Sequence, residues 1–163
     1  MQEKVAVFPG SFDPFTVGHE SIVLRGLNLF SHIVIAVGYN SSKKSLFTLE
    51  ERIQMIEKIF VAYPNVSVQS YQGLTVEFCK SVKAGYILRG LRTASDFEFE
   101  RAIAQVNRMM DGGLESVFLL TSPELTPVNS TIVRDILIHG GDASMFIPKG
   151  INIADYIKPH LSR

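Results

Sequence analysis

The chain has 163 residues, 46% hydrophobic and 20% charged, a balance typical of a soluble globular protein rather than a disordered or membrane-spanning one. Basic and acidic residues each number 16, so the formal net charge is zero, which argues against a general nucleic-acid binder and against an anionic-membrane binder. The length predicts one domain over residues 1–163. No amino-terminal leader and no run of ~20 apolar residues is visible, and the single cysteine, Cys79, cannot form an internal disulfide, so we expect a cytoplasmic protein.

The amino-terminal segment predicts a buried strand followed by an abrupt turn. Residues Val5 to Phe8 are apolar and rich in β-branched and aromatic side chains, which favours a central strand covered on both faces. The turn dipeptides Pro9-Gly10 and Asp13-Pro14 follow closely. Because the residue before a proline is biased away from the helical region, we expect the backbone to leave the strand directly after Phe8.

A helix is expected immediately after this turn. Thr16 suits the N-cap, and Gly18 and His19 fall in the first helical turn. The N-terminus of a helix has unpaired N–H groups and attracts phosphate, and Gly18 allows a ligand to approach the backbone. We therefore expect His19 to face an anion, where a ring nitrogen can stabilise charge that builds on a phosphoryl oxygen; the alternative is an ordinary surface histidine.

Strand and helix patterns alternate through the rest of the chain. Apolar or alternating runs predict further strands, and apolar residues at helical spacing predict the helices between them. Two capping boxes, Thr48-x-x-Glu51 and Ser95-x-x-Glu98, and the cap residue Asn152 are expected to begin three of these helices. The expected strands cover residues 33–37, 66–71, 86–88 and 115–120, and the expected helices run from residue 48 to before residue 64, over 75–83, 95–110 and 130–139, and beyond residue 152.

This alternation predicts an α/β fold with a Rossmann-like, doubly wound, five-stranded parallel sheet and helices on both faces. In such sheets ligands bind beyond the carboxyl ends of the strands, so polar residues that follow strands are expected to converge on one site. These candidates are Ser11 and His19 after the first strand, Lys43 after the second, Arg89 and Arg92 after the fourth, and Ser130 after the fifth.

The basic candidates each have a simpler interpretation. Lys43 lies in a serine-rich loop, where a lysine is commonly solvated. Arg89 and Arg92 offer two guanidinium groups for phosphate oxygens, but each can instead pair with an acidic residue, which we expect of Arg92 more than of Arg89. Of the nearby acidic residues, Asp96 and Glu98 are expected to serve the dipole of a helix N-terminus rather than a metal ion.

The start of the helix expected over residues 130–139 also has two interpretations. Ser130 and Thr131 open this helix after a proline-containing loop, so their hydroxyl and N–H groups can face an anion. The simpler interpretation is that they only cap the helix. The residues alone leave both open.

Several motifs resemble one family. The stretch Gly-Ser-Phe-Asp-Pro-Phe-Thr-Val-Gly-His at residues 10–19 resembles the G-[ST]-F-D-P-x-[TH]-x-G-H signature of the nucleotidylyltransferase superfamily, which is related in fold to class I aminoacyl-tRNA synthetases. The segments at residues 42–48 (SKKSLFT), 89–92 (RGLR), 96–100 (DFEFE) and 130–134 (STIVR) narrow the resemblance to the phosphopantetheine adenylyltransferase family. It runs from about residue 3 to the carboxyl terminus.

The resemblance implies transfer of the adenylyl group of ATP to 4′-phosphopantetheine, giving dephospho-CoA and pyrophosphate. It also implies Mg²⁺ with the ATP, a homohexamer and feedback inhibition by coenzyme A. It assigns His19, Lys43, Arg92 and Ser130 to catalysis, and Ser11, Lys43, Thr75 and Arg89 to the acceptor. The ATP-binding residues that it implies are Ser11, Phe12, His19, Gly90, Leu91, Arg92, Glu100, Leu125, Thr126, Pro127, Val128, Asn129, Ser130 and Thr131.

Three positions depart from the common pattern of the superfamily. Thr16 stands where many members have a first histidine, Asn129 stands where many have serine, and Ser11 stands where many have threonine. None removes a charged group, so we expect the chemistry to be retained and the affinity for ATP to be the property most exposed to change. Two other functions stay open on the residues alone: transfer of an adenylyl or cytidylyl group to another phosphorylated acceptor, and a non-catalytic nucleotide sensor.

Overall fold

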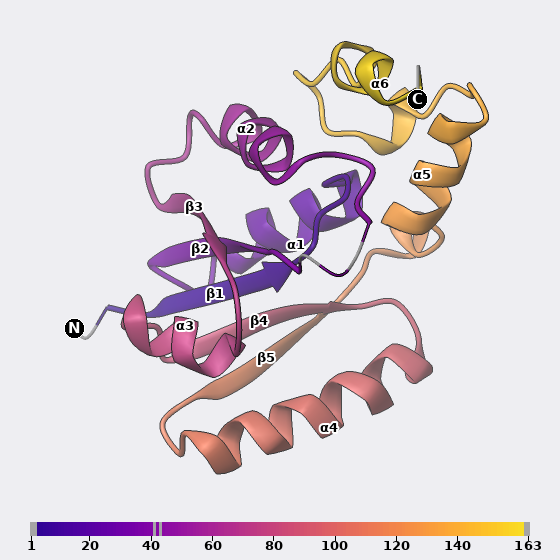
Figure 1. The fold of residues 1–163 in the computed structure, drawn as a ribbon. Coiled ribbons are helices and arrows are strands. Elements are labelled where there is room, and N and C mark those ends of the chain that lie inside the picture. Colours follow the sequence, from indigo (N-terminus) through magenta and orange to yellow (C-terminus); the bar gives the residue numbers. More distant parts are fainter. Residues whose placement is uncertain (1–2, 41, 43, 162–163) are drawn as a thin grey trace.

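The structure is a computed structural model that describes residues 3–40, 42 and 44–161, with only the backbone described for residues 158–161. Its centre is a five-stranded sheet in the order β3-β2-β1-β4-β5, in which every neighbouring pair is parallel. This confirms the doubly wound α/β fold expected from the sequence (Figure 1). The strands are β1 (Val5–Gly10), β2 (His32–Gly38), β3 (Val66–Tyr71), β4 (Tyr86–Leu91) and β5 (Glu115–Leu120).

Helices cover both faces of the sheet, and two further helices stand beside its carboxyl edge (Figure 1). α1 and α2 pack on one face, α3 and α4 lie on the other, and α5 and α6 follow the last strand. Short 3₁₀ turns at Pro123–Leu125 and Ser144–Phe146 flank α5. The helices are α1 (Val17–Gly26), α2 (Leu49–Ile59), α3 (Thr75–Ser81), α4 (Ala94–Met110), α5 (Ser130–Ile138) and α6 (Ala154–Leu161).

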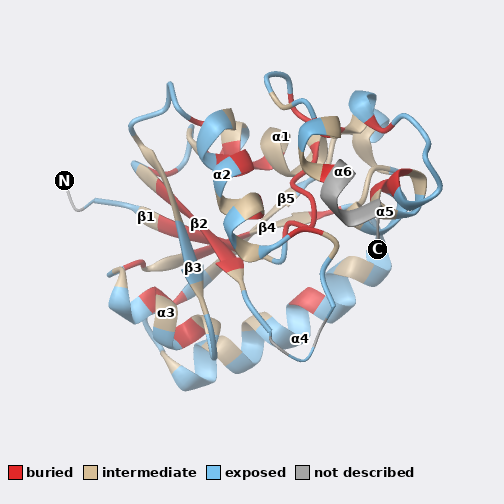
Figure 2. Ribbon diagram, turned by 45° about the horizontal axis from the view of Figure 1, so that its top comes forward, coloured by how far each residue is buried: buried red, intermediate tan, exposed pale blue. Residues whose placement is uncertain are grey.

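The core follows from the alternation of side chains along the central strands. In β1, Ala6 and Phe8 pack with the α1 and α2 side chains, whereas Val7 packs with Val76 of α3 on the opposite face. A third cluster, which contains Phe47 together with residues of α2, α5 and α6, attaches the carboxyl-terminal helices. Figure 2 shows the buried centre of the sheet and the largely exposed surface of α4. No helix among the described residues has the length and apolar character needed to span a bilayer.

Two strands continue two or three residues beyond their expected carboxyl ends. β1 continues to Gly10 instead of ending at Phe8, and β4 continues to Leu91, so Arg89 lies inside a strand rather than after one. β1 pairs with β2 along its whole length but with β4 only at Ala6 and Val7. Proline has no backbone N–H to donate to a neighbouring strand. Pro9 is tolerated in β1 because the pairing with β4 ends at Val7, before Pro9 is reached.

The helix starts were predicted with mixed success. The structure confirms the N-cap at Thr16 and the capping box at Thr48. It also shows a capping box at Thr16 that was not expected, in which His19 takes the place of the usual acidic partner. The capping box expected at Ser95 is wrong: α4 is capped by the Thr93 hydroxyl, which accepts the N–H of Asp96 at 3.2 Å. Asn152 is not the residue directly before α6, which begins at Ala154, and its Nδ2 donates to the Asp155 carboxylate at 3.0 Å.

Candidate active site

The turn after β1 is closed tightly on itself. Phe12 has a φ of 48°, in the left-handed region that non-glycine residues rarely adopt. A Cβ atom on Gly10 would lie 2.8 Å from the Phe12 ring, so this position needs glycine. The turn therefore holds Ser11 at the carboxyl edge of the sheet by a backbone arrangement that few other sequences permit.

The same turn is tied to the loop that follows β2. The buried Asp13 carboxylate accepts the N–H groups of Leu46 at 2.8 Å and Phe47 at 2.9 Å. The buried Arg52 of α2 donates to the Ser11 carbonyl at 2.6 Å. Because backbone groups of both loops are bonded, the turn after β1 is fixed against the segment that follows Lys43; Lys43 itself lies outside the described residues.

α5 is fastened to this turn from the other side. The Ser130 hydroxyl donates to the Pro14 carbonyl at 2.8 Å, and Arg134 donates to the Asp13 carbonyl at 2.8 Å. Asn129, not Ser130, is the N-cap, since its side-chain oxygen accepts the Ile132 N–H at 3.0 Å. The simple capping role considered for Ser130 is therefore wrong, and its hydroxyl instead joins α5 to the turn.

His19 is held in one orientation. Its ring packs against Phe8, Phe12 and Phe15, with centroid separations of 5.1–6.3 Å, and Nδ1 accepts the backbone N–H of Thr16 at 3.0 Å. Burial, with a smaller contribution from the positive charges of nearby arginines, lowers the pKa of His19 to about 4. The ring is thus neutral at pH 7, and because Nδ1 is an acceptor its proton sits on Nε2.

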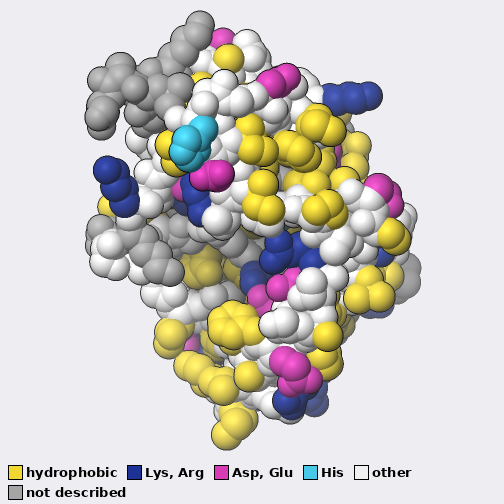
Figure 3. All heavy atoms as spheres, turned by 90° about the vertical axis from the view of Figure 1, so that its right-hand side faces the viewer, with side chains coloured by type: hydrophobic (Ala, Val, Ile, Leu, Met, Phe, Trp, Pro, Cys, Tyr) yellow, Lys and Arg dark blue, Asp and Glu magenta, His cyan; other side chains and the backbone are white. Residues whose placement is uncertain are grey.

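Two pockets meet at the carboxyl edge of the sheet. One, of about 660 Å³, is lined by residues of α3, α4, β4 and β5, and the other, of about 360 Å³, surrounds His19 and the start of α5. Figure 3 shows the face that is on the right of Figure 1, where basic and acidic side chains gather in a central hollow. The residues that line both pockets are Pro9, Gly10, Ser11, Arg89 and Glu100.

The structure brings most of the expected site residues together. Thr75 lines the larger pocket with Ser11 and Arg89. Gly90 lines the smaller pocket, and a Cβ atom there would lie 2.9 Å from Ile22 of α1, so helix packing alone already requires glycine. Ten of the fourteen expected ATP-binding residues line the smaller pocket: Ser11, Phe12, His19, Gly90, Arg92, Glu100, Val128, Asn129, Ser130 and Thr131.

The four remaining positions line neither pocket. Leu91 is buried at the end of β4. Leu125, Thr126 and Pro127 lie in and after the 3₁₀ turn that leads to α5, where the Leu125 carbonyl accepts the N–H of Val128 at 3.0 Å. These three residues lie between β5 and α5, directly before Val128, which does line the smaller pocket.

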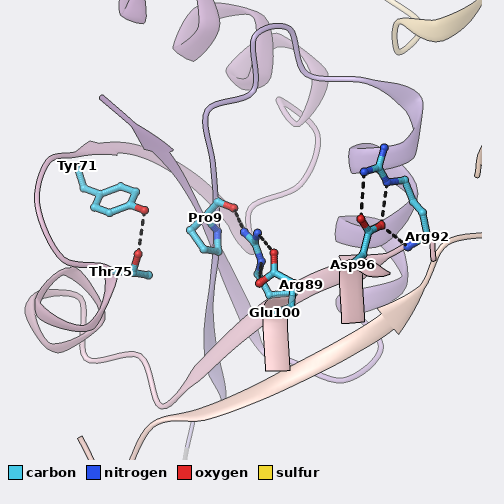
Figure 4. A network of polar contacts seen from close by, with 7 residues as sticks. All are labelled: Pro9, Tyr71, Thr75, Arg89, Arg92, Asp96 and Glu100. Atoms are coloured by element: carbon cyan, nitrogen blue, oxygen red, sulfur yellow. Dashed lines mark hydrogen bonds and ion pairs between the residues drawn. The ribbon is translucent and has the colours of Figure 1, made fainter. Parts of the chain in front are cut away.

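Both arginines are held by carboxylates of α4 (Figure 4). Glu100 accepts from Nε and Nη2 of Arg89, and Asp96 accepts from the side chain and the backbone N–H of Arg92. The expectation that Arg89 is less suited to an ion pair is therefore wrong. Asp96 serves Arg92: burial opposes its ionisation, but the hydrogen bonds from Arg92 outweigh this and lower the pKa of Asp96.

The acidic residues do not form a metal centre in the described part of the chain, where no three His, Cys, Asp or Glu side chains are grouped to hold an ion. Glu98, between the two carboxylates, pairs instead with Arg101 at 2.8 Å on an exposed face. The carboxylates four residues apart thus face the site, and the one between them faces away from it.

Sequence reasoning missed part of the larger pocket. Ile103 and Asn107 of α4 line it, as does Tyr71, whose hydroxyl lies 3.0 Å from that of Thr75. A signal for the α4 residues was present, because positions 100, 103 and 107 recur on one face of a helix. Tyr71 gave no such signal, since the end of a strand carries no mark of the helix that will pack beside it.

Comparison with known proteins agrees with this architecture. The cytidylyltransferase-like family matches over residues 7–136. A phosphopantetheine adenylyltransferase from Flavobacterium johnsoniae is 52% identical over 150 residues, which are 92% of this chain and 98% of that protein. Another, from Bacteroides fragilis, is 48% identical over 148 residues, which are 91% of this chain and 98% of that protein.

Solved structures of lower sequence identity share the fold. A putative nicotinate-nucleotide adenylyltransferase from Vibrio parahaemolyticus has a TM-score of 0.69 at 17% identity, with 94% of this chain and 91% of that chain covered. A bifunctional NMN adenylyltransferase/ADP ribose pyrophosphatase from Francisella tularensis has a TM-score of 0.70 at 17% identity, with 93% of this chain covered. This chain spans 47% of the Francisella chain, and at such identity the likeness supports the fold alone.

Proposed function

Since this chain belongs to the phosphopantetheine adenylyltransferases, a family of nucleotidyltransferases, we propose that its two pockets hold the two substrates of one transfer. The enzyme moves the adenylyl group of ATP to the phosphate of 4′-phosphopantetheine, giving dephospho-CoA and pyrophosphate in coenzyme A biosynthesis. We assign ATP to the pocket around His19 and the acceptor to the pocket between α3 and α4. The observation that carries this assignment is that the two pockets share Ser11 and Arg89, where acceptor phosphate and nucleotide must meet.

The chemistry needs alignment more than it needs a base. The acceptor is already a phosphate anion, so no proton has to be removed before it attacks the α-phosphorus of ATP. Ser11, Lys43 and Arg89 are proposed to hold the acceptor phosphate, and Arg92 with Ser130 at the start of α5 to hold the triphosphate. The neutral His19 is proposed to donate its Nε2–H to a phosphoryl oxygen as charge builds on it.

Magnesium is proposed to arrive with the nucleotide. Asp96 and Glu100, the acidic residues that line the smaller pocket, are both bonded to arginines, so they are poor candidates for metal ligands. Mg²⁺ prefers phosphate oxygens and water to an all-protein cage, and on the triphosphate it would neutralise negative charge.

Assembly and regulation are further parts of the proposal. Phe99, Val106 and Met109 of α4 are 68%, 54% and 86% exposed, which favours contact with a second copy in the homohexamer expected from the family. Coenzyme A contains both a phosphopantetheine arm and an adenine nucleotide, so it would occupy both pockets and inhibit. We also propose a cytoplasmic location, where ATP is supplied. Light scattering tests the assembly, and inhibition by coenzyme A in the forward assay tests the regulation.

Pyrophosphate release tests the function. The protein is incubated with ATP or CTP and with a panel of phosphorylated acceptors, and we expect release with ATP and 4′-phosphopantetheine above every other pair. Release with another acceptor or with CTP would favour a different transferase. ATP binding without release would indicate the nucleotide sensor.

A further inference from the structure

The pair formed by Arg89 and Glu100 stands at the junction of the two pockets. Nε of Arg89 donates to Glu100 Oε2 at 2.9 Å, Nη2 donates to Oε1, and Nη1 donates to the Pro9 carbonyl at 2.6 Å. Figure 4 shows the guanidinium between these two partners, one on β1 and one on α4. β1 and β4 stop pairing after Val7, so the Arg89 side chain reaches across the opening between the strands.

These contacts use part of the guanidinium and leave part of it available. An arginine carries five N–H donors, and the three contacts within the described residues occupy three of them. One N–H on each terminal nitrogen remains, in a group whose plane is set by a bidentate carboxylate on one side and a carbonyl on the other. A guanidinium held in this way can present two N–H groups to a phosphate. Because its side chain is already ordered before the phosphate binds, binding costs little further conformational entropy.

Glu100 has little capacity for a direct contact with ATP. Both of its oxygens accept from Arg89, and the residue is only 9% exposed. A carboxylate turned toward the triphosphate would also meet charge of its own sign. Along α4, Asp96 lies one turn before Glu100 and lines the smaller pocket, whereas Ile103 and Asn107, one and two turns after it, line the larger one. Glu100 therefore stands where the helix passes from the nucleotide side to the acceptor side.

We propose that Glu100 is a positioning residue for the acceptor: it fixes the Arg89 guanidinium at the junction so that its free N–H groups receive the phosphate of 4′-phosphopantetheine. This assignment rests on the proposed function, and it moves Glu100 from the nucleotide, where the family resemblance put it, to the acceptor. Glu100 acts only through Arg89, so its contribution disappears when Arg89 is absent.

The experiment compares Glu100→Gln with Glu98→Gln in the forward assay. Glu98 lies on the same helix and also pairs with an arginine, but on an exposed face, which makes it the matched control. Glu100→Gln is expected to raise the Michaelis constant for 4′-phosphopantetheine by about tenfold or more, the effect of losing a charge-assisted hydrogen bond, and to change that for ATP less than about threefold. Glu98→Gln is expected to change neither constant.

A double-mutant cycle then tests whether Glu100 acts through Arg89. In an Arg89→Ala background, adding Glu100→Gln is expected to leave the constant for 4′-phosphopantetheine unchanged, since no guanidinium remains to be positioned. Full additivity, or an effect confined to ATP, would overturn the proposal. If Glu100→Gln does not fold, as judged by circular dichroism, Glu100→Asp replaces it; the shorter carboxylate is expected to give a smaller rise in the same constant, and no rise overturns the proposal.

Turnover by the wild-type protein distinguishes failure of the proposed function from failure of the role assigned to Glu100. No turnover of 4′-phosphopantetheine by the wild type would overturn the proposed function and this assignment together. Normal turnover by the wild type, with an unchanged acceptor constant in Glu100→Gln, would overturn the role of Glu100 alone.

Discussion

The Nδ1 atom of His19 accepts the backbone N–H of Thr16 at 3.0 Å, within a capping box in which a histidine takes the usual place of glutamate. A backbone N–H can only donate, so this single contact makes Nδ1 an acceptor and leaves the proton on Nε2. The residue that caps α1 thereby also sets the tautomer of the ring that lines the smaller pocket.

Nitrogen NMR of the free protein tests the state of this ring. We expect the His19 signals to report the neutral Nε2–H tautomer and to show no titration between pH 8 and about pH 5, because the pKa is lowered to about 4. A His19 midpoint near its ordinary value of 6.5, or an Nδ1–H tautomer, would contradict the account.

The lowered pKa of His19 also determines how this residue makes the free energy of unfolding depend on pH. Between pH 6.5 and about pH 4 the unfolded chain binds a proton at His19 that the folded chain does not bind, so folding is progressively weakened as the pH falls through this window. In urea unfolding, the loss of free energy between pH 7 and pH 5 is expected to be smaller in His19→Asn than in the wild type.

Removing the ring is predicted to affect turnover more than binding. His19→Ala is expected to lower turnover by about two to three orders of magnitude, because one preorganised donor to the transition state is worth roughly 3–4 kcal/mol. The dissociation constant for ATP should change only a few-fold, since the other residues around the smaller pocket are unaltered. His139→Ala, assayed beside it, should behave as the wild type, and near-normal turnover by His19→Ala would refute the assignment.

Asn129 and Ser130 are predicted to differ in importance. Asn129 caps α5, and serine is an equally good cap, so Asn129→Ser should change the Michaelis constant for ATP only modestly and leave turnover nearly intact. Ser130→Ala removes the hydroxyl that bonds Pro14 and lies at the helix N-terminus, so we expect it to raise that constant by about tenfold. Loss of activity in Asn129→Ser together with a silent Ser130→Ala would show that the roles are reversed.

Asp13 is predicted to matter for both stability and the acceptor. Asp13→Asn turns one of two acceptor oxygens into a donor facing an N–H, and a buried bond lost in this way costs about 1–3 kcal/mol. The free energy of unfolding in urea should fall by that amount, and the constant for 4′-phosphopantetheine should rise because the loop carrying Lys43 is loosened. Asp135→Asn, at an exposed position of α5, is the control and should change neither quantity.

The fold was predictable because each local signal agreed with the global one. The apolar run at Val5, the caps at Thr16 and Thr48, and the alternation of strands and helices all indicate a doubly wound sheet, which the structure confirms. Boundaries were less predictable where tertiary pairing decides them. Nothing local shows that β2 continues to pair with Pro9, or that β4 continues through Arg89.

The sequence predicted which residues gather at the site. It did not predict which of them form hydrogen bonds with one another. Motif positions such as His19 and Arg89 do reach one edge of the sheet. An ion pair of Arg89 was the less favoured alternative, and the family resemblance put Glu100 at the nucleotide, because the pairing of these two residues depends on how α4 crosses the sheet. Helical spacing places Asp96 and Glu100 on one face, but only the packed structure shows what that face meets.

The two pockets are proposed to bind different substrates and to meet at Arg89. Calorimetric titration of Arg89→Ala and Arg92→Ala with each substrate tests this most directly, because these two arginines lie three residues apart yet line the pockets differently. We predict that Arg89→Ala weakens binding of 4′-phosphopantetheine by at least about tenfold and changes ATP binding little, and that Arg92→Ala does the opposite. The reverse pattern, or equal losses for both substrates in both variants, would show that the two pockets do not divide the substrates in this way.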